Sequence, residues 1–102
     1  SGQYVSPFEV EATLVKHPAV LEAALIGVPD DNGLTRSKAF VVLKDGRAGS
    51  PELEAELKAF VKEALAPYKY PRAVQFISEL PKTATGKIQR FRLREMEAAR
   101  AR

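Results

Sequence analysis

The chain has 102 residues, of which 45% are apolar and 28% are charged, and its net charge is +3. This length suits one small domain, and this mixture argues against an intrinsically disordered protein. Cysteine is absent, which excludes disulfides and thiolate metal sites, and no apolar run approaches the roughly 20 residues of a membrane span. The N-terminus lacks the apolar stretch of a signal peptide, so we expect a cytoplasmic protein.

A first helix is expected from Ser6-Pro7 to about Lys16. Serine suits the N-cap, proline suits the first helical position, and Glu9 completes a capping box. The helix should stop before His17, because a residue that precedes proline avoids the helical region. His17 itself is expected to cap the helix or to lie on the surface. The residues expected to face the core are Phe8, Leu14 and Val15.

Two strands follow, over residues 20–28 and 38–43, because both stretches are apolar and rich in β-branched residues. The connection between them is too short for a crossover helix, so we expect them to pair antiparallel. A second helix begins at Ser50-Pro51 by the same cap logic. Its apolar stripe consists of Leu53, Leu57, Phe60, Val61 and Leu65.

The remaining elements are a short strand at residues 73–77, a polar loop at residues 81–87 and a last helix at residues 90–99. No internal repeat or low-complexity linker divides the chain. The order of these elements predicts one α+β domain over residues 1–102, with a small, mainly antiparallel three-stranded sheet and flanking helices.

Positive charge is concentrated at the C-terminal end of the chain. The residues concerned are Lys82, Lys87, Arg90, Arg92, Arg94, Arg100 and Arg102, opposed only by Glu95 and Glu97. Such a cluster is either a solvated helix face or a surface that meets a polyanion, such as a nucleotide, CoA or a nucleic acid. A small nucleic-acid-binding module is therefore one alternative, although no aromatic stacking motif accompanies the basic residues.

The segment Leu-Pro-Lys-Thr-Ala-Thr-Gly-Lys-Ile, residues 80–88, is the most informative one. Its Gly86-Lys87 pair suggests a phosphate-binding loop, but that motif needs a glycine where Pro81 stands and a serine or threonine where Ile88 stands. The segment is therefore no Walker A loop. A lone lysine in a loop is most often a solvated charge, so a role for Lys87 needs support from other segments.

Three segments supply that support by their order and spacing. They are Pro-Lys-Thr-x-x-Gly-Lys-Ile-x-Arg at residues 81–90, Ser-Gly-Gln-Tyr-Val-Ser-Pro-Phe-Glu-Val-Glu at residues 1–11, and Leu-Ala-Pro-Tyr-Lys-Tyr-Pro at residues 65–71. Together they resemble the last core motif, the stretch after the interdomain hinge and a short motif after the second helix of the adenylate-forming enzyme superfamily. Within that superfamily the match is closest to benzoate-CoA ligases.

The resemblance implies an ATP-dependent carboxylate–CoA ligase, acting on benzoate or another aromatic acid, of which this chain is the mobile C-terminal domain. In such enzymes the carboxylate attacks the α-phosphate of ATP to give an acyl-adenylate, and CoA then displaces AMP. ATP, CoA and Mg²⁺ are the implied cofactors. They are held mainly by an N-terminal domain that this sequence lacks, so the isolated chain is expected to be inactive. An adenylation domain that serves a carrier protein is the alternative.

On this resemblance Lys87 is the catalytic lysine of the first step, and Gly86 gives its loop freedom of movement. The residues expected to face CoA in the second step are Gly2, Gln3, Tyr4, Tyr68, Tyr70 and Arg72. An aromatic ring suits adenine and a guanidinium suits phosphate. The alternative is that the tyrosines simply pack beside prolines and that Arg72 is solvated. A lysine acetyltransferase that neutralises Lys87 is a further expected partner.

Overall fold

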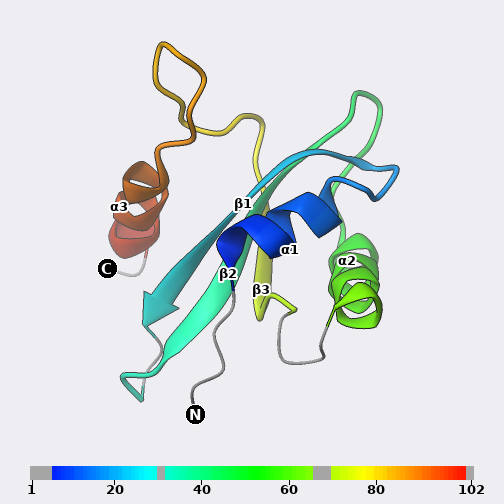
Figure 1. The fold of residues 1–102 in the computed structure, drawn as a ribbon, viewed down its shortest axis with the longest axis horizontal. Helices are drawn as coiled ribbons and strands as arrows, with labels where there is room; N and C mark the ends of the chain where they lie inside the picture. Colours follow the sequence, from blue (N-terminus) through cyan, green and yellow to red (C-terminus); the bar gives the residue numbers. More distant parts are fainter. Residues whose placement is uncertain (1–5, 30–31, 66–69, 101–102) are drawn as a thin grey trace.

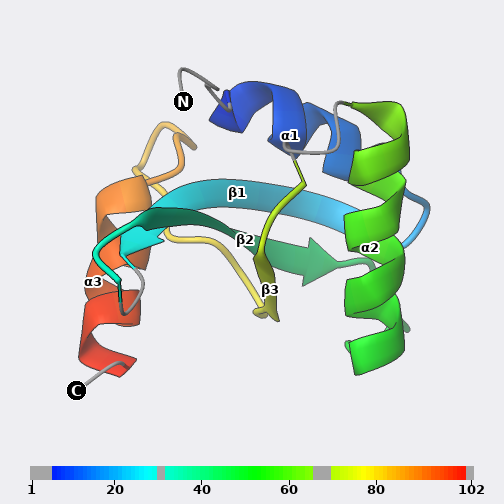
Figure 2. The ribbon, with the colours of Figure 1, turned by 90° about the horizontal axis from the view of Figure 1, so that it is seen from below.

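Within residues 6–29, 32–65 and 70–100, which the computed structural model describes, three strands form one sheet and three helices lie around it (Figure 1). The strands are β1 (Val20–Pro29), β2 (Thr35–Leu43) and β3 (Ala73–Phe76). The helices are α1 (Pro7–Leu14), α2 (Pro51–Ala64) and α3 (Arg90–Arg100). In Figure 2, α2 and α3 stand at opposite sides of the sheet and α1 lies across one of its faces. The predicted α+β class is confirmed.

The sheet has the strand order β1-β2-β3, and its longer ladder is antiparallel. β1 and β2 pair from Val20 opposite Leu43 to Pro29 opposite Thr35, as their short connection predicted. β3 lies on the other side of β2 and runs parallel to it. A parallel pair needs a long crossover, and α2 lies in that connection. The sheet is therefore mainly antiparallel, as expected.

β2 is longer than the sequence predicted. It begins at Thr35, before the expected start at Lys38, because Thr35, Arg36 and Ser37 continue the ladder opposite β1. These side chains are polar and are not buried, so hydrophobicity did not mark them as part of a strand. The ladder needs only backbone N–H and C=O groups, which polar residues supply equally well.

α1 begins at Pro7 as predicted, but the expected side-chain cap by Ser6 is wrong. Ser6 occupies the N-cap position with an extended backbone, yet its side chain accepts no cap hydrogen bond. The first turn depends instead on Pro7 and on the Val10 N–H, which donates to the Ser6 carbonyl oxygen over 3.3 Å. At its other end α1 stops at Leu14, slightly earlier than predicted.

α1 also buries a different face from the one expected. Val10 and Leu14 are fully buried, whereas Phe8 is 69% exposed and Val15 is 44% exposed. Phe8 and Val15 lie two turns apart, so they share one face of the helix, and that face meets solvent. The prediction was right for Leu14 and wrong for the other two, because spacing does not decide which of two apolar stripes of a short helix meets the sheet.

α2 has the cap that the sequence predicted and all of the predicted stripe except Phe60, which is half-buried against His17 and outside the core. The Leu53 N–H donates to Ser50 Oγ over 3.0 Å, which satisfies one of the free N–H groups of the first turn. Leu57 and Val61 are fully buried, and Leu53 and Leu65 pack at the margin of the same core. The strict helical spacing of these residues explains why this element was predicted so closely.

Both faces of the sheet are covered. Alternate residues point to opposite faces, so that Leu25 and Val41 belong to one core while Ile26 and Phe40 belong to the other. Residues of α1 and α2 complete the first core, and Leu93 of α3, which is fully buried, completes the second. Burial on both faces explains why the middle of β1, residues 23–26, and the second half of β2 are continuous apolar runs.

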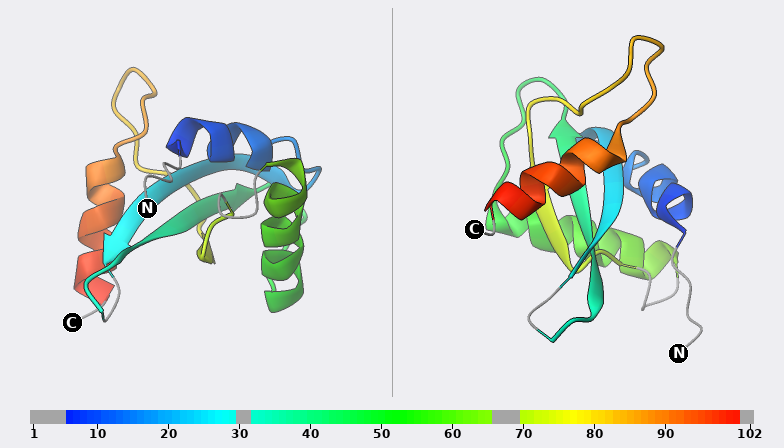
Figure 3. Two further views of the ribbon diagram at one scale, coloured as in Figure 1. Left: turned by 60° about the horizontal axis from the view of Figure 1, so that its bottom comes forward. Right: turned by 90° about the vertical axis from the view of Figure 1, so that its left-hand side faces the viewer.

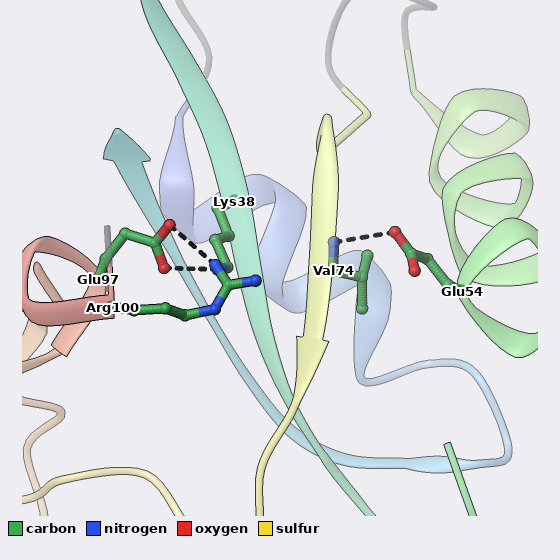
Figure 4. Close-up of polar contacts among 5 residues, drawn as sticks. All are labelled: Lys38, Glu54, Val74, Glu97 and Arg100. Atoms are coloured by element: carbon green, nitrogen blue, oxygen red, sulfur yellow. Dashed lines mark hydrogen bonds and ion pairs between the residues drawn. The ribbon is translucent and has the colours of Figure 1, made fainter. Parts of the chain in front are cut away.

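Polar contacts join α3 and α2 to the sheet as well (Figure 4). The Lys38 side chain of β2 is 5% exposed and pairs with Glu97 of α3 at 2.5 Å, and Arg100 approaches the same carboxylate at 3.4 Å. On the other side the Val74 N–H of β3 donates to Glu54 of α2 over 3.4 Å. A buried lysine is costly unless it is paired, so Glu97 fixes where the end of α3 lies over the sheet.

Candidate active site

The segment that contains Lys87 forms a short hairpin, here named the lysine hairpin (residues 82–88). Lys82 and Ile88 pair in an antiparallel bridge. The Thr83 N–H donates to the Lys87 carbonyl oxygen over 2.9 Å, and the Gly86 N–H donates to the Thr83 carbonyl oxygen over 2.9 Å. These bonds close a three-residue loop of the kind that ends in a glycine. The lysine hairpin, drawn in orange, projects beyond the sheet (Figures 1 and 3).

Gly86 is required by the turn itself. Its φ is +90°, a conformation that other residues rarely adopt, although a Cβ there would meet no atom within 4 Å. Side chains reinforce the turn, because Thr83 Oγ1 accepts from the Lys87 N–H over 3.1 Å and lies 2.9 Å from Thr85 Oγ1. Gly86 thus permits one defined loop shape, whereas the sequence suggested only freedom of movement.

The Lys87 side chain is exposed, and no described residue offers its ammonium a carboxylate within ion-pair distance. Lys82, at the start of the same hairpin, pairs with Glu22 of β1. Lys82 is therefore paired within the domain, whereas the Lys87 side chain is exposed to solvent. An exposed ammonium on a short, hydrogen-bonded loop can contact an anion that a neighbouring domain brings to it.

The end of the lysine hairpin leads directly into an ion pair that the sequence did not suggest. Arg90, the first residue of α3, donates from Nη2 to Glu11 Oε1 over 2.6 Å and from Nε to Oε2 over 3.2 Å. Glu11 Oε2 also accepts from the Leu25 N–H of β1 over 2.7 Å. Both charged residues lie inside the segments that carried the family resemblance, but local spacing cannot pair two residues 79 positions apart.

Tyr70 and Arg72 lie at the opposite end of β3 from the lysine hairpin (Figure 1). Tyr70 is half-buried against the core that α1 and α2 cover. The Arg72 guanidinium lies 5.7 Å from the centre of the Tyr70 ring, and Lys62 Nζ lies 5.3 Å from it. The Arg72 N–H donates to the Ser37 carbonyl oxygen over 3.0 Å. The Tyr70 ring thus packs against the core, while two exposed cations, Lys62 and Arg72, lie beside it.

The other residues expected to face CoA cannot be placed. Gly2, Gln3, Tyr4 and Tyr68 lie outside the residues that the structure describes. Their roles, and that of Gly86 in binding, stay predictions.

His17 is buried, so the expected surface position is wrong. The Ala19 N–H donates to His17 Nδ1 over 3.1 Å, which leaves the proton on Nε2 to bond Glu56 at 2.5 Å. The ring meets Phe60 edge-on at 5.2 Å between centroids. His17, Glu56, Phe60 and Glu63 are among the residues that line a shallow depression beside α2. The histidine thus stabilises the junction of α1, β1 and α2.

No group of three or more His, Cys, Asp or Glu side chains in the described ranges could hold a metal ion. None of the helices described is both long enough and apolar enough to cross a bilayer.

Comparison with known proteins places this geometry in context. Residues 9–87 match the family model described as AMP-binding enzyme C-terminal domain. A benzoate–CoA ligase of Thauera aromatica is 60% identical over 94 residues, which make up 92% of this chain and 18% of that protein. The chain thus spans about a fifth of the length of the curated relatives that it matches.

Solved structures agree. The structure of an acyl-CoA synthetase from Brucella canis has a TM-score of 0.92 at 51% identity, covering 100% of this chain and 19% of that one. A benzoate CoA ligase from Burkholderia xenovorans LB400 has a TM-score of 0.84 at 62% identity, covering 91% of this chain and 19% of that one.

Proposed function

The chain belongs to the family of AMP-binding enzyme C-terminal domains, and from this premise we propose that it is the mobile C-terminal domain of an ATP-dependent carboxylate–CoA ligase. The observation that carries the proposal is the lysine hairpin, on which an exposed ammonium is presented by a hydrogen-bonded loop. Similarity to benzoate–CoA ligases supports an aromatic acid as the substrate.

Lys87 acts in the first half-reaction. A carboxylate oxygen attacks the α-phosphorus of ATP, pyrophosphate leaves, and negative charge develops between the two reactants. The ammonium of Lys87 bridges these oxygens and stabilises that charge more strongly in the transition state than in the ground state. One donor of this kind is typically worth roughly a hundred- to thousandfold in rate. Lysine suits the task, because it is a compact cation on a long stem.

The opposite end of β3 serves the second half-reaction, in which the CoA sulfur attacks the acyl carbon and AMP leaves. Arg72 contacts a phosphate of CoA, and Tyr70 supplies a ring beside it. The separation of Tyr70 and Arg72 from the lysine hairpin supports a domain that turns between the two steps. We assign the pantetheine arm to Gly2, Gln3 and Tyr4 on the family resemblance alone.

The N-terminal domain of the same polypeptide is the main partner, and it supplies the acid pocket and most ATP contacts. The described part of this chain does not fit a Mg²⁺ site, because it lacks a carboxylate cluster that could hold a metal. A cytoplasmic location and acetylation of Lys87 by a lysine acetyltransferase stay predictions.

Two alternatives make different predictions. A domain that serves a carrier protein would not transfer the acyl group to free CoA. A nucleic-acid-binding module would need a free basic surface, but Lys82, Arg90 and Arg100 each pair with a glutamate of this chain. Such pairing removes part of the charge that phosphate groups would need.

The test uses the full-length polypeptide that contains this chain, with benzoate and a short aliphatic acid as competing substrates. In Lys87→Ala we expect benzoate-dependent ATP–pyrophosphate exchange to fall roughly a hundred- to thousandfold. Thioester formation from preformed benzoyl-adenylate and CoA should be retained, because that step does not use the lysine.

Lys44→Ala is the matched control, since Lys44 is also an exposed lysine in a turn. It should leave both half-reactions unchanged. Equal loss of both half-reactions in Lys87→Ala would assign Lys87 a structural role, and unchanged exchange would refute the proposal. A preference for the aliphatic acid would overturn the aromatic substrate class alone.

A further inference from the structure

Two ion pairs lie at the base of the lysine hairpin, one at its first residue and one at the start of the helix that follows it. Lys82, on the outgoing strand, pairs with Glu22 of β1. Arg90, just after the returning strand, pairs with Glu11 of α1. The Gln89 N–H, between them, donates to the carbonyl oxygen of Pro81 over 2.9 Å. The hairpin thus has an exposed tip and a base that is bonded to two other elements.

The Arg90–Glu11 pair is the better built of the two. The guanidinium donates from Nε and Nη2 to both carboxylate oxygens, and the two side chains are only 24% and 11% exposed. The Leu25 N–H of the edge strand β1 donates to the same carboxylate. The Phe8 ring lies 5.1 Å from the guanidinium carbon. Such a fork allows little change in distance or angle.

Attachment of α3 does not depend on this pair alone. Leu93 is fully buried, and Glu97 pairs with the buried Lys38 at the far end of the helix. A partly buried ion pair also adds little net stability, because desolvation offsets most of its attraction. Its distinctive effect is geometric: it fixes residue 90, three positions after Lys87, relative to α1 and β1.

We propose that Arg90 is a positioning residue for Lys87, and that its fork on Glu11 fixes the direction in which the lysine hairpin leaves the domain. This inference rests on the proposed adenylation role of Lys87. A lysine on a loose hairpin would sample many directions, and a displacement of about 1 Å at a reacting centre can cost roughly a hundredfold in rate. Arg90 itself touches no substrate.

Arg90→Met in the full-length polypeptide tests the proposal, and Arg100→Met is the matched control. Arg100 lies on the same helix and loses the same charge, but its pair with Glu97 is at the opposite end. We expect Arg90→Met to lower the maximal rate of benzoate-dependent ATP–pyrophosphate exchange roughly ten- to hundredfold, with the KM for ATP and thioester formation from benzoyl-adenylate unchanged. Arg90→Lys, which keeps the charge but not the fork, should recover only part of this loss.

A second measurement separates positioning from general destabilisation. Amide hydrogen exchange of the 102-residue chain should become faster at Thr83, Gly86, Lys87 and Gln89 in Arg90→Met, but not in Arg100→Met, and not at core amides such as Val41. If Arg90→Met fails to fold because Glu11 is left without its partner, the double variant Glu11→Gln/Arg90→Met, which removes both charges, is used in place of the single variant.

The outcomes are distinguishable. If the rate of ATP–pyrophosphate exchange and the amide protection of the lysine hairpin in Arg90→Met both lie within twofold of those in Arg100→Met, the positioning role is overturned. Faster hydrogen exchange at every amide of Arg90→Met, together with a loss of both half-reactions, would also overturn the positioning role and make the Arg90–Glu11 pair purely structural. If Lys87→Ala leaves ATP–pyrophosphate exchange intact, the proposed function fails, while the hydrogen-exchange comparison still decides whether Arg90 orders the hairpin.

Discussion

The lysine hairpin and the Tyr70–Arg72 segment lie at opposite ends of β3, and they expose their cations in different ways (Figure 1). Lys87 stands on a loop whose hydrogen bonds are local, and its side chain contributes nothing to the core. Arg72 lies beside the ring of Tyr70, which does pack on the core. Substitution of Lys87 can therefore change the proposed function without changing stability, whereas substitution of Tyr70 should change both.

The largest effect on stability should come from Tyr70→Ala. Removal of a half-buried ring should lower the free energy of unfolding by ~2 kcal/mol, below the range for a fully buried aromatic. Lys87→Ala should change it by less than about 0.5 kcal/mol, because the side chain is exposed. Urea denaturation of the 102-residue chain measures both.

Tyr70→Phe is the control for that comparison, since it keeps the ring and removes only the hydroxyl. Its stability should stay close to that of the parent. Equal destabilisation by Tyr70→Ala and Lys87→Ala would erase the distinction between the two regions.

Gly86→Ala should have the next largest effect. A residue with a Cβ at a φ of +90° is strained by about 1–2 kcal/mol, so the lysine hairpin should shift to another loop shape. We expect ATP–pyrophosphate exchange in the full-length polypeptide to fall roughly fivefold to thirtyfold, with thioester formation unchanged.

Gly46→Ala provides a matched control. Gly46 has a φ of +83°, and a Cβ there would also meet no atom within 4 Å, but it lies in the turn after β2. It should lower stability by a similar amount and leave ATP–pyrophosphate exchange intact. Equal loss of exchange in both variants would mean that general strain, not the shape of the lysine hairpin, controls the first step.

Arg72→Ala should have the smallest effect. An exposed contact between a guanidinium and a phosphate is worth at most about 1 kcal/mol, so the KM for CoA should rise by no more than roughly fivefold. ATP–pyrophosphate exchange and the free energy of unfolding should not change. Inhibition by desulfo-CoA, which cannot form a thioester, measures the affinity for CoA independently of turnover. A KM for CoA equal to that of the parent would assign Arg72 to the solvated alternative.

Elements with a strong local signal were predicted well. α2 has a serine cap and apolar residues at helical spacing, and the structure contains both. α1 shows the limit of the same reasoning: its start was predicted correctly, but Phe8 and Val15 are exposed. β2 begins earlier than predicted because its first residues are polar but keep the backbone ladder.

The candidate site was predicted in part for a similar reason. Lys87 and Gly86 lie next to each other in a recognisable string, so the sequence pointed to both. Glu11 and Arg90 were each part of a recognised segment, yet their partnership was not foreseen. The buried Lys38 was placed in a strand without any sign that a helical glutamate would neutralise it.

The sequence by itself determined the order of helices and strands, the family, and the lysine on which the proposed chemistry depends, because these follow from local periodicity and from contiguous motifs. Only the tertiary structure decided that β3 runs parallel to β2, that Gly86 adopts a positive φ, and that Arg90 meets Glu11. Arg90 and Glu11 are 79 positions apart. Such contacts form only when burial of both faces of the sheet brings α1, β1 and α3 together, and local spacing carries no record of that arrangement.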